Sequence, residues 1–328
     1  MLKYIVVIRE NLKNIVDSDV YTRLKPILAQ VSKPLVIAGS GPSLQRINYR
    51  RLPENFLTFR INNFFLEDKY YLGKDIDLCF QSMPREEAIY TLANTITEYD
   101  YNLKSDLIFT LDRVTERFPN RSLFPRVEIE KILSLDSKMY SYILEIFYYQ
   151  HKHVTSGILS LLGAIALGFK DIYMIGVDFY SDKEKRYAYK IGENYRKSVE
   201  AQDLQPGYSE QFHSREIDLK GLDVALSYQD VKVQSICDDA FINQFISLAP
   251  EVRQDQFKVE KKSDDTIKDY ILLKSKKQNF FERSGITQEL KSLKNTQLVK
   301  FLWSFFIKPI FIIPITIIIK FIKGLFAK

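Results

Sequence analysis

The sequence predicts an α/β protein with a mainly parallel β-sheet. From Leu35 onward, short apolar runs alternate with helical stretches, which is the pattern of βα units in a parallel sheet. The first run ends in a glycine turn, Gly39-Ser40-Gly41, where backbone N–H groups can face a phosphate. The second run ends in Asn62, about 20 residues after this turn, where such folds contact a ribose. Together these features indicate a Rossmann-like nucleotide-binding domain.

Six apolar runs of four to six residues predict the strands of the sheet. They cover residues 35–38, 56–61, 78–81, 107–110, 171–175 and 231–236. A long apolar stretch with small residues, 155–167, predicts a buried helix that ends at Gly168 as its C-terminal cap. Residues 1–34 are expected to be a helical or mixed lead-in without chemistry, and residues 35–250 the nucleotide-binding domain.

A tyrosine-rich insertion separates the last two predicted strands. Residues 181–186 form a charged turn, and residues 187–213 are polar and only weakly periodic. Such a segment buries little surface by itself. We therefore expect residues 179–213 to be a small lid subdomain inserted into the main domain.

Composition and charge exclude several classes of protein. Aromatic residues make up 13% of the 328 residues, as in an ordered protein. The two cysteines, Cys79 and Cys237, indicate buried thiols in a reducing compartment rather than a disulfide framework or a metal cluster. Residues 1–250 carry a net charge of −2 and residues 251–328 one of +8. The globular part therefore has no basic face for nucleic acid.

The positive charge belongs to the C-terminal region. Residues 251–300 are charged with helical patches and are expected to be a linker, followed by a basic apolar tail over residues 301–328. The uninterrupted apolar run, 309–319, has 11 residues, too few to span a bilayer, and the run from Leu302 has 18 if Lys308 is included. We expect a membrane-associating helix that lies in the interface. A single span, or a helix packed on the protein's own core, stays open.

The glycine turn lacks features of a dinucleotide-binding loop. Gly39 and Gly41 can adopt positive φ and lack Cβ, so a phosphate or base can approach the backbone. Pro42 suits the first position of a helix. The third glycine of the dinucleotide fingerprint is missing, and Asn62 stands where an NAD-dependent oxidoreductase has an acidic residue. A tight turn without any ligand is the alternative.

Three side chains outside the turn could carry chemistry. His213 is one of three histidines, and a neutral imidazole is a natural general base. Tyr180 and Tyr187 flank the charged turn, and phenol hydroxyls can donate to a departing phosphate without a metal. A surface histidine and ordinary packing tyrosines are the alternatives. His151 and His153 have no third ligand close in sequence, so no metal site is predicted.

Eleven short blocks within residues 35–250 match one known family in order. They cover residues 37–44, 51–53, 59–62, 67–74, 155–157, 164–168, 172–173, 176–180, 187–188, 213–214 and 248–250. The block Glu67-Asp68-Lys69-Tyr70-Tyr71-Leu72-Gly73-Lys74 and the block Asp178-Phe179-Tyr180 are the most specific. With these blocks the chain resembles the bacterial sialyltransferases of glycosyltransferase family 42, which build sialylated ends on lipooligosaccharide.

The resemblance implies a fold, a donor and a mechanism. The fold would be a GT-A-like variant of the Rossmann-like domain with a small lid, and the donor would be CMP-sialic acid. His213 would be the general base that deprotonates a galactose or sialic acid hydroxyl, in one inverting displacement. Tyr180 and Tyr187 would stabilise the leaving phosphate, with no metal or other cofactor required. The donor-binding positions would be Gly39, Ser40, Gly41, Asn62, Ser82, Thr155, Ser156, Gly157 and Asp178.

Three positions depart from the family pattern. Ser40 replaces an asparagine between the glycines, Ser82 an asparagine after the third strand, and His153 an arginine. These departures motivate an alternative, a catalytically degenerate nucleotide-binding protein at the membrane. The resemblance also implies a galactose-terminated acceptor, with α2,3 linkage as the default and α2,8 as the alternative. It further implies a homo-tetramer bound peripherally to the cytoplasmic face of the bacterial inner membrane.

Overall fold

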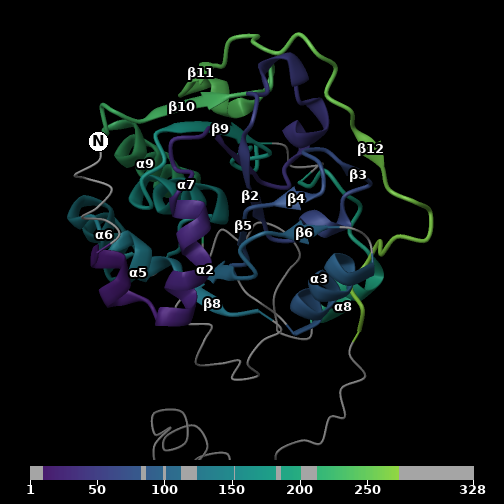
Figure 1. Cartoon of the computed structure of the whole chain (residues 1–328), viewed down its shortest axis with the longest axis horizontal. Coiled ribbons are helices and arrows are strands. Elements are labelled where there is room, and N and C mark those ends of the chain that lie inside the picture. Colours follow the sequence, from purple (N-terminus) through teal and green to yellow (C-terminus); the bar gives the residue numbers. More distant parts are fainter. Residues whose placement is uncertain are drawn as a thin grey trace, which may run out of the picture. The chain divides into compact units, whose positions relative to one another are not determined.

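A parallel eight-stranded sheet forms the centre of the protein (Figure 1). The computed structural model describes residues 10–82, 86–98, 101–111, 124–150, 152–181, 186–200 and 213–272. The strand order is β11-β10-β9-β1-β2-β5-β7-β8, and each neighbouring pair is parallel. The strands are β1 (Leu35–Ala38), β2 (Leu57–Ile61), β5 (Leu78–Phe80), β7 (Ile108–Thr110), β8 (Arg126–Glu128), β9 (Asp171–Ile175), β10 (Lys232–Ser235) and β11 (Ser247–Leu248). The predicted α/β class with a mainly parallel sheet is confirmed.

All six predicted strands are present, and all belong to this sheet. Every residue of β1 and β2 is buried, as expected for parallel strands covered on both faces. Within the eight-stranded sheet, the two strands that the sequence analysis did not predict, β8 and β11, lie at the edges. β11 has two exposed residues, and β8 carries a charge at each end. Neither forms an apolar run, so neither was predicted.

The order of the strands reverses at β1. From β1 the chain passes through β2, β5, β7 and β8 toward one edge, then returns to β9 on the other side of β1. Leu35 lies opposite both Leu57 of β2 and Ile172 of β9. In open α/β sheets, ligands bind beyond the carboxyl ends of the strands at such a reversal. The loops after β1 and β9 are therefore where a ligand site is expected.

Helices cover both faces of the sheet. Five of them, α2 (Ser18–Leu28), α5 (Ile129–Leu133), α6 (Ser137–Leu144), α7 (Ser156–Ala166) and α9 (Arg215–Leu226), gather on one side in Figure 1. Two more, α3 (Glu86–Glu98) and α8 (Glu193–Glu200), lie together near β6 (Asn102–Leu103). A π-helical turn, η4 (Glu145–Tyr149), follows α6. The short 3₁₀ helices are η1 (Pro42–Arg46), η2 (Tyr49–Arg51), η3 (Phe64–Leu66) and η5 (Phe241–Gln244).

Helix α7 is the buried helix that the sequence predicts. Its residues from Gly157 to Ala166 are all buried. Gly168 has a φ of +102°, and its N–H donates to the carbonyl of Ile165 while the N–H of Phe169 donates to that of Ala164. These two bonds are the Schellman arrangement that a glycine cap permits.

The segment after residue 250 is packed on the domain as far as the structure describes it. Strand β12 (Glu260–Lys261) pairs with β3 (Lys69–Tyr70), and a second small sheet joins β4 (Asp75–Ile76) to β6. The Lys262 amine donates to the carbonyl of Phe65 at 3.0 Å, and burial lowers its pKa to about 8. Tyr270 is buried and donates to Asn63 at 2.7 Å. The expected linker over 251–300 is thus in contact with the domain at least to Tyr270.

The predicted tail, residues 301–328, and the rest of the predicted linker from residue 273 lie outside the described residues. Within the ranges that are described, no helix has the length and apolarity needed to cross a membrane.

Candidate active site

The glycine turn after β1 packs against the loop after β9. The Gly39 N–H donates to the Ile175 carbonyl and the Gly41 N–H to the Gly176 carbonyl, both at 2.9 Å. A Cβ on Gly39 would lie 2.3 Å from the Gly176 oxygen, and one on Gly41 would lie 2.3 Å from an Asp178 carboxylate oxygen. Both glycines are therefore required by the close approach of the two loops.

This requirement differs from the one that the sequence predicted. Gly41 has a φ of −73°, and Gly39 is not among the described glycines with positive φ. The left-handed residue is Gly176, with a φ of +65°. The space that side chains at Gly39 and Gly41 would occupy is filled by the protein's own loop rather than left open for a ligand.

Asp178 holds the start of η1. Its carboxylate accepts from the Ser43 N–H at 2.9 Å, and the Ser43 hydroxyl in turn accepts from the Gly176 N–H at 3.0 Å. Burial raises the pKa of Asp178, while the hydrogen bonds from Ser43 lower it. Pro42 begins η1, as the sequence predicts. The contacts of Asp178 thus fix the glycine turn in place.

Asn62 gathers polar side chains from three further elements. It directly follows β2 and has a φ of +53°, a left-handed conformation that asparagine tolerates better than most residues. Its amide nitrogen donates to the Ser156 hydroxyl at 3.2 Å, and its amide oxygen accepts from the Ser82 N–H at 3.1 Å. The Ser40 hydroxyl lies 3.5 Å from the Ile61 carbonyl. Four predicted donor-binding residues therefore meet at the carboxyl ends of β1, β2 and β5 and the start of α7.

The first turn of α7 supplies the remaining predicted donor residues. Thr155 is the N-cap residue, and its N–H donates to Asp218 Oδ1 at 2.8 Å. A Cβ on Gly157 would lie 2.8 Å from a Val177 methyl carbon, so α7 packs directly on the loop after β9. A helix N-terminus presents free N–H groups and a positive dipole end, which suit a phosphate.

His213 lies beside this turn, just before α9. Its Nδ1 is 2.8 Å from the carbonyl oxygen of His153. A carbonyl can only accept, so Nδ1 carries the proton and Nε2 is the basic nitrogen of the neutral ring. Burial lowers the pKa of His213, and the bond to His153 partly opposes this. The imidazole is therefore held neutral and in one tautomer near pH 7.

Tyr180 begins the predicted lid in a strained backbone. Phe179 and Tyr180 both have a φ of +51°, which costs on the order of 1–3 kcal/mol for each non-glycine residue. The Phe179 ring packs on those of Phe241 and Phe245, at centroid distances of 6.0 and 6.2 Å. The Phe179 carbonyl also accepts from Arg215 at 3.4 Å. These contacts hold Tyr180 near the start of α9.

Tyr187 lies where the chain returns to the glycine turn. The N–H of the next residue, Ala188, donates to the Ser40 carbonyl at 2.8 Å. The Tyr187 ring stacks on Tyr189 at 5.1 Å. Burial raises the pKa of Tyr187, and the neighbouring Tyr195 and Tyr180 raise it further, so the two predicted tyrosines are close enough to interact. Residues 182–185 and 201–212 of the predicted lid lie outside the described residues.

Asp218 is a residue of this region that the sequence reasoning missed. It lies on α9, is 1% exposed, and contacts Thr155. A signal was present, because an acidic side chain next to Ile217 and four residues before Leu222 falls on the apolar face of that helix.

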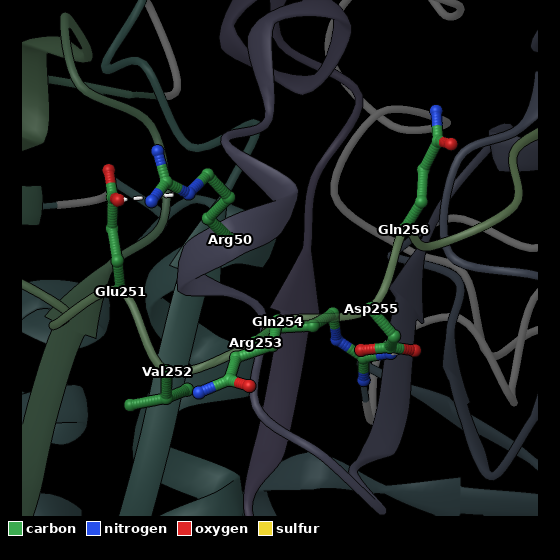
Figure 2. A pocket seen from close by; sticks show the side chains of 7 residues that line it. All are labelled: Arg50, Glu251, Val252, Arg253, Gln254, Asp255 and Gln256. Carbon is green, nitrogen blue, oxygen red and sulfur yellow. Dashed lines mark hydrogen bonds and ion pairs between the residues drawn. The ribbon is translucent and has the colours of Figure 1, made fainter.

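A surface hollow lies elsewhere in the chain (Figure 2). Its lining joins Arg50 to residues 251–256, and Arg50 forms an ion pair with Glu251 at 3.0 Å. None of the predicted site residues lines it. Across the described ranges, no cluster of three or more histidine, cysteine or acidic side chains is arranged to hold a metal ion. The polar residues around Asn62 and His213 are thus the stronger candidate site.

Comparison with known proteins gives a family match over most of the chain. The family model described as alpha-2,3-sialyltransferase (CST-I) matches residues 33–317. The chain is also 28% identical over 123 residues to an uncharacterized protein of Haemophilus influenzae, over 36% of this chain and 51% of that protein. The chain therefore spans about half the length of this curated relative.

Solved structures agree with the family match. The chain is 29% identical to the monofunctional alpha-2,3-sialyltransferase Cst-I of Campylobacter jejuni, with a TM-score of 0.67 over 79% of this chain and 95% of that one. It is 29% identical to CstII of Campylobacter jejuni in complex with the substrate analogue CMP-3FNeuAc, with a TM-score of 0.66 over 76% and 99%. A structure of CST-II with a trisaccharide acceptor and CMP gives 29% identity and a TM-score of 0.63, over 76% and 99%.

Proposed function

Because this chain belongs to the CST-I family of alpha-2,3-sialyltransferases, which are glycosyltransferases, we propose that it transfers sialic acid from CMP-sialic acid to a terminal galactose of lipooligosaccharide. The linkage formed is α2,3. The observation that supports this best is the bond from His213 to His153, which brings a neutral imidazole next to the first turn of α7. A base beside a donor-binding helix terminus is what a direct displacement needs.

The donor binds across the carboxyl ends of β1, β2 and β5. Asn62 contacts the cytidine and ribose portion, and Ser82 and Ser156 orient its amide by hydrogen bonds. The free N–H groups at the start of α7 face the phosphate. Gly39, Gly41 and Asp178 keep the loops after β1 and β9 together, so they support this site through packing.

His213 starts the transfer. Its Nε2 takes the proton from the acceptor hydroxyl while that oxygen attacks the anomeric carbon of the sialic acid. The bond from the anomeric carbon to the CMP phosphate oxygen breaks in the same step, which inverts the configuration. Tyr180 and Tyr187 donate hydrogen bonds to the phosphate as its negative charge develops. Because the departing group is a phosphate monoester, these phenols take the place of a divalent cation.

The C-terminal region brings the enzyme to its acceptor. Residues 251–328 carry a net charge of +8, and residues 301–328 combine lysines with an apolar run. Such a segment binds anionic headgroups and inserts its apolar face at the interface. We propose a homo-tetramer attached in this way to the cytoplasmic face of the bacterial inner membrane.

Release of CMP from CMP-sialic acid tests the transfer. We expect the full-length chain to release CMP when lactose is present and to form a product that an α2,3-specific sialidase cleaves. A chain that binds CMP but releases none from CMP-sialic acid would instead be a degenerate nucleotide-binding protein. A product resistant to that sialidase would contradict the linkage.

A further inference from the structure

A three-residue segment, 153–155, links the proposed base to the proposed donor site. At one end the His153 carbonyl accepts from His213 Nδ1 at 2.8 Å. At the other end the Thr155 N–H donates to Asp218 Oδ1, also at 2.8 Å. His213 directly precedes Ser214, the N-cap residue of α9, and Asp218 lies in the first turn of this helix, so the start of α9 holds the segment at two points.

Asp218 is rigidly placed for this contact. It is 1% exposed, and its N–H donates to the carbonyl of Ser214, the N-cap residue of α9, at 3.1 Å. Tyr142 of α6 donates to the Ile217 carbonyl at 2.6 Å. A Cβ on Gly221 would lie 2.6 Å from an Ile158 methyl carbon, so α9 lies directly against α7. Neither helix can shift without breaking these contacts.

We propose that Asp218 is a positioning residue of the transfer reaction, which holds Thr155 and the start of α7 in register with His213. The inference rests on the proposed function, because it takes residues 155–157 as part of the donor site. A buried carboxylate is costly unless it is hydrogen-bonded. The partners described for Asp218 are the backbone and side chain of Thr155, so the buried carboxylate holds that one residue in place.

The charge of Asp218 makes the contact sensitive to pH. Burial raises its pKa to about 7, and the hydrogen bonds from Thr155 oppose the rise. From α6 it is faced by Tyr142, whose phenol stays protonated because burial raises its pKa. Helix α7 carries no ionisable side chain, and His153 and His213 are the titratable groups at the other end of the segment. The ionised carboxylate accepts from Thr155 more strongly than the neutral acid does.

Two variants and a control test this role in the full-length chain. We expect Asp218→Ala to raise the dissociation constant of CMP and the KM for CMP-sialic acid by about 10-fold or more, with a smaller fall in kcat. Asp218→Asn keeps the shape and an accepting oxygen, so it should restore most of the affinity, and its CMP binding should depend less on pH near 7 than that of the wild type. Leu222→Ala, at a buried position on the same helix, should lower the melting temperature and leave CMP binding unchanged.

The outcomes separate this inference from the proposed function. If wild-type protein binds no CMP, both fail. If wild-type protein binds CMP and transfers sialic acid, but Asp218→Ala binds CMP within about twofold of it, only the positioning role fails. Equal losses in Asp218→Ala and Leu222→Ala would also overturn it, since stability alone would explain them. If Asp218→Ala does not fold, an unchanged pH profile of CMP binding in Asp218→Asn overturns it instead.

Discussion

Replacement of His213 should remove two separable contributions. The Nδ1–H bond to the His153 carbonyl is 2.8 Å long, and such a bond contributes about 0.5–1.5 kcal/mol to the free energy of unfolding. The other nitrogen, Nε2, is the proposed base, and general base catalysis contributes roughly 10²–10⁴-fold. We therefore expect His213→Ala to lose about that factor in kcat and to be less stable by about that energy.

An asparagine at the same position separates the two effects. Its amide nitrogen lies near the place of Nδ1 and can donate to the His153 carbonyl, but it has no basic nitrogen. We expect His213→Asn to regain most of the stability in urea unfolding, while its rate of CMP release with lactose stays as low as that of His213→Ala. Recovery of transfer by His213→Asn to within about threefold of wild type would refute the assignment of the base.

The pH profile of kcat gives an independent check on the same residue. Only the neutral ring can take a proton, and burial lowers the pKa of His213 below its usual 6.5. We expect kcat to fall as the pH drops through this lowered pKa and to stay level above 6.5. Because the folded-state pKa is the lower one, the same acidification removes the stability that neutral His213 contributes. A kcat that rises only above pH 7 would contradict this account.

Four further predictions address other parts of the site. Tyr180→Phe and Tyr187→Phe should each lower kcat more than they weaken CMP binding. If calorimetry showed weaker CMP binding while kcat stayed unchanged, the phenols would contribute to ground-state binding and not to stabilisation of the transition state. Gly41→Ala should lower the free energy of unfolding in urea by about 1–3 kcal/mol and weaken CMP binding, because its Cβ would meet the Asp178 carboxylate. An unchanged CMP affinity would show that the glycine turn does not support the donor site. EDTA should leave kcat unchanged, and a loss restored by Mg²⁺ would show that the phenols do not replace a cation. A chain ending at residue 272 should keep transfer to lactose and lose binding to anionic vesicles, and vesicle binding by this chain would exclude the tail as the anchor. A chain ending at residue 259 should unfold more readily, because it lacks β12, Lys262 and Tyr270.

The sequence predicted those parts of the fold that depend on local patterns. Buried parallel strands are apolar runs, so all six predicted strands were found, and small apolar residues identified α7. Only the family resemblance placed Asn62 and Ser156 in one site, and the structure joins the two side chains by a hydrogen bond.

Contacts between distant segments were beyond the sequence. The reason for Gly41 was wrong, because its neighbours Gly176 and Asp178 follow far along the chain and nothing local indicates them. Asp218 lies on the apolar face of α9, which was a signal of burial, but its partner Thr155 lies 63 positions earlier and no local pattern indicates it. The bond from the Lys262 amine to the Phe65 carbonyl depends on the pairing of β12 with β3, and strands of two residues have no recognisable sequence pattern.

The reversal of strand order at β1 also constrains how the protein is made. Ser43 and Asp178, which join the two loops at this reversal, are 135 positions apart. During synthesis the ribosome delivers β1, β2, β5, β7 and β8 first, and the glycine turn stays without its packing partner until β9 emerges. Closing so long a loop is slow, because its entropic cost precedes the contacts that offset it. A nascent chain that stops before residue 171 therefore contains five of the eight strands of the sheet but lacks the loop that packs on the glycine turn.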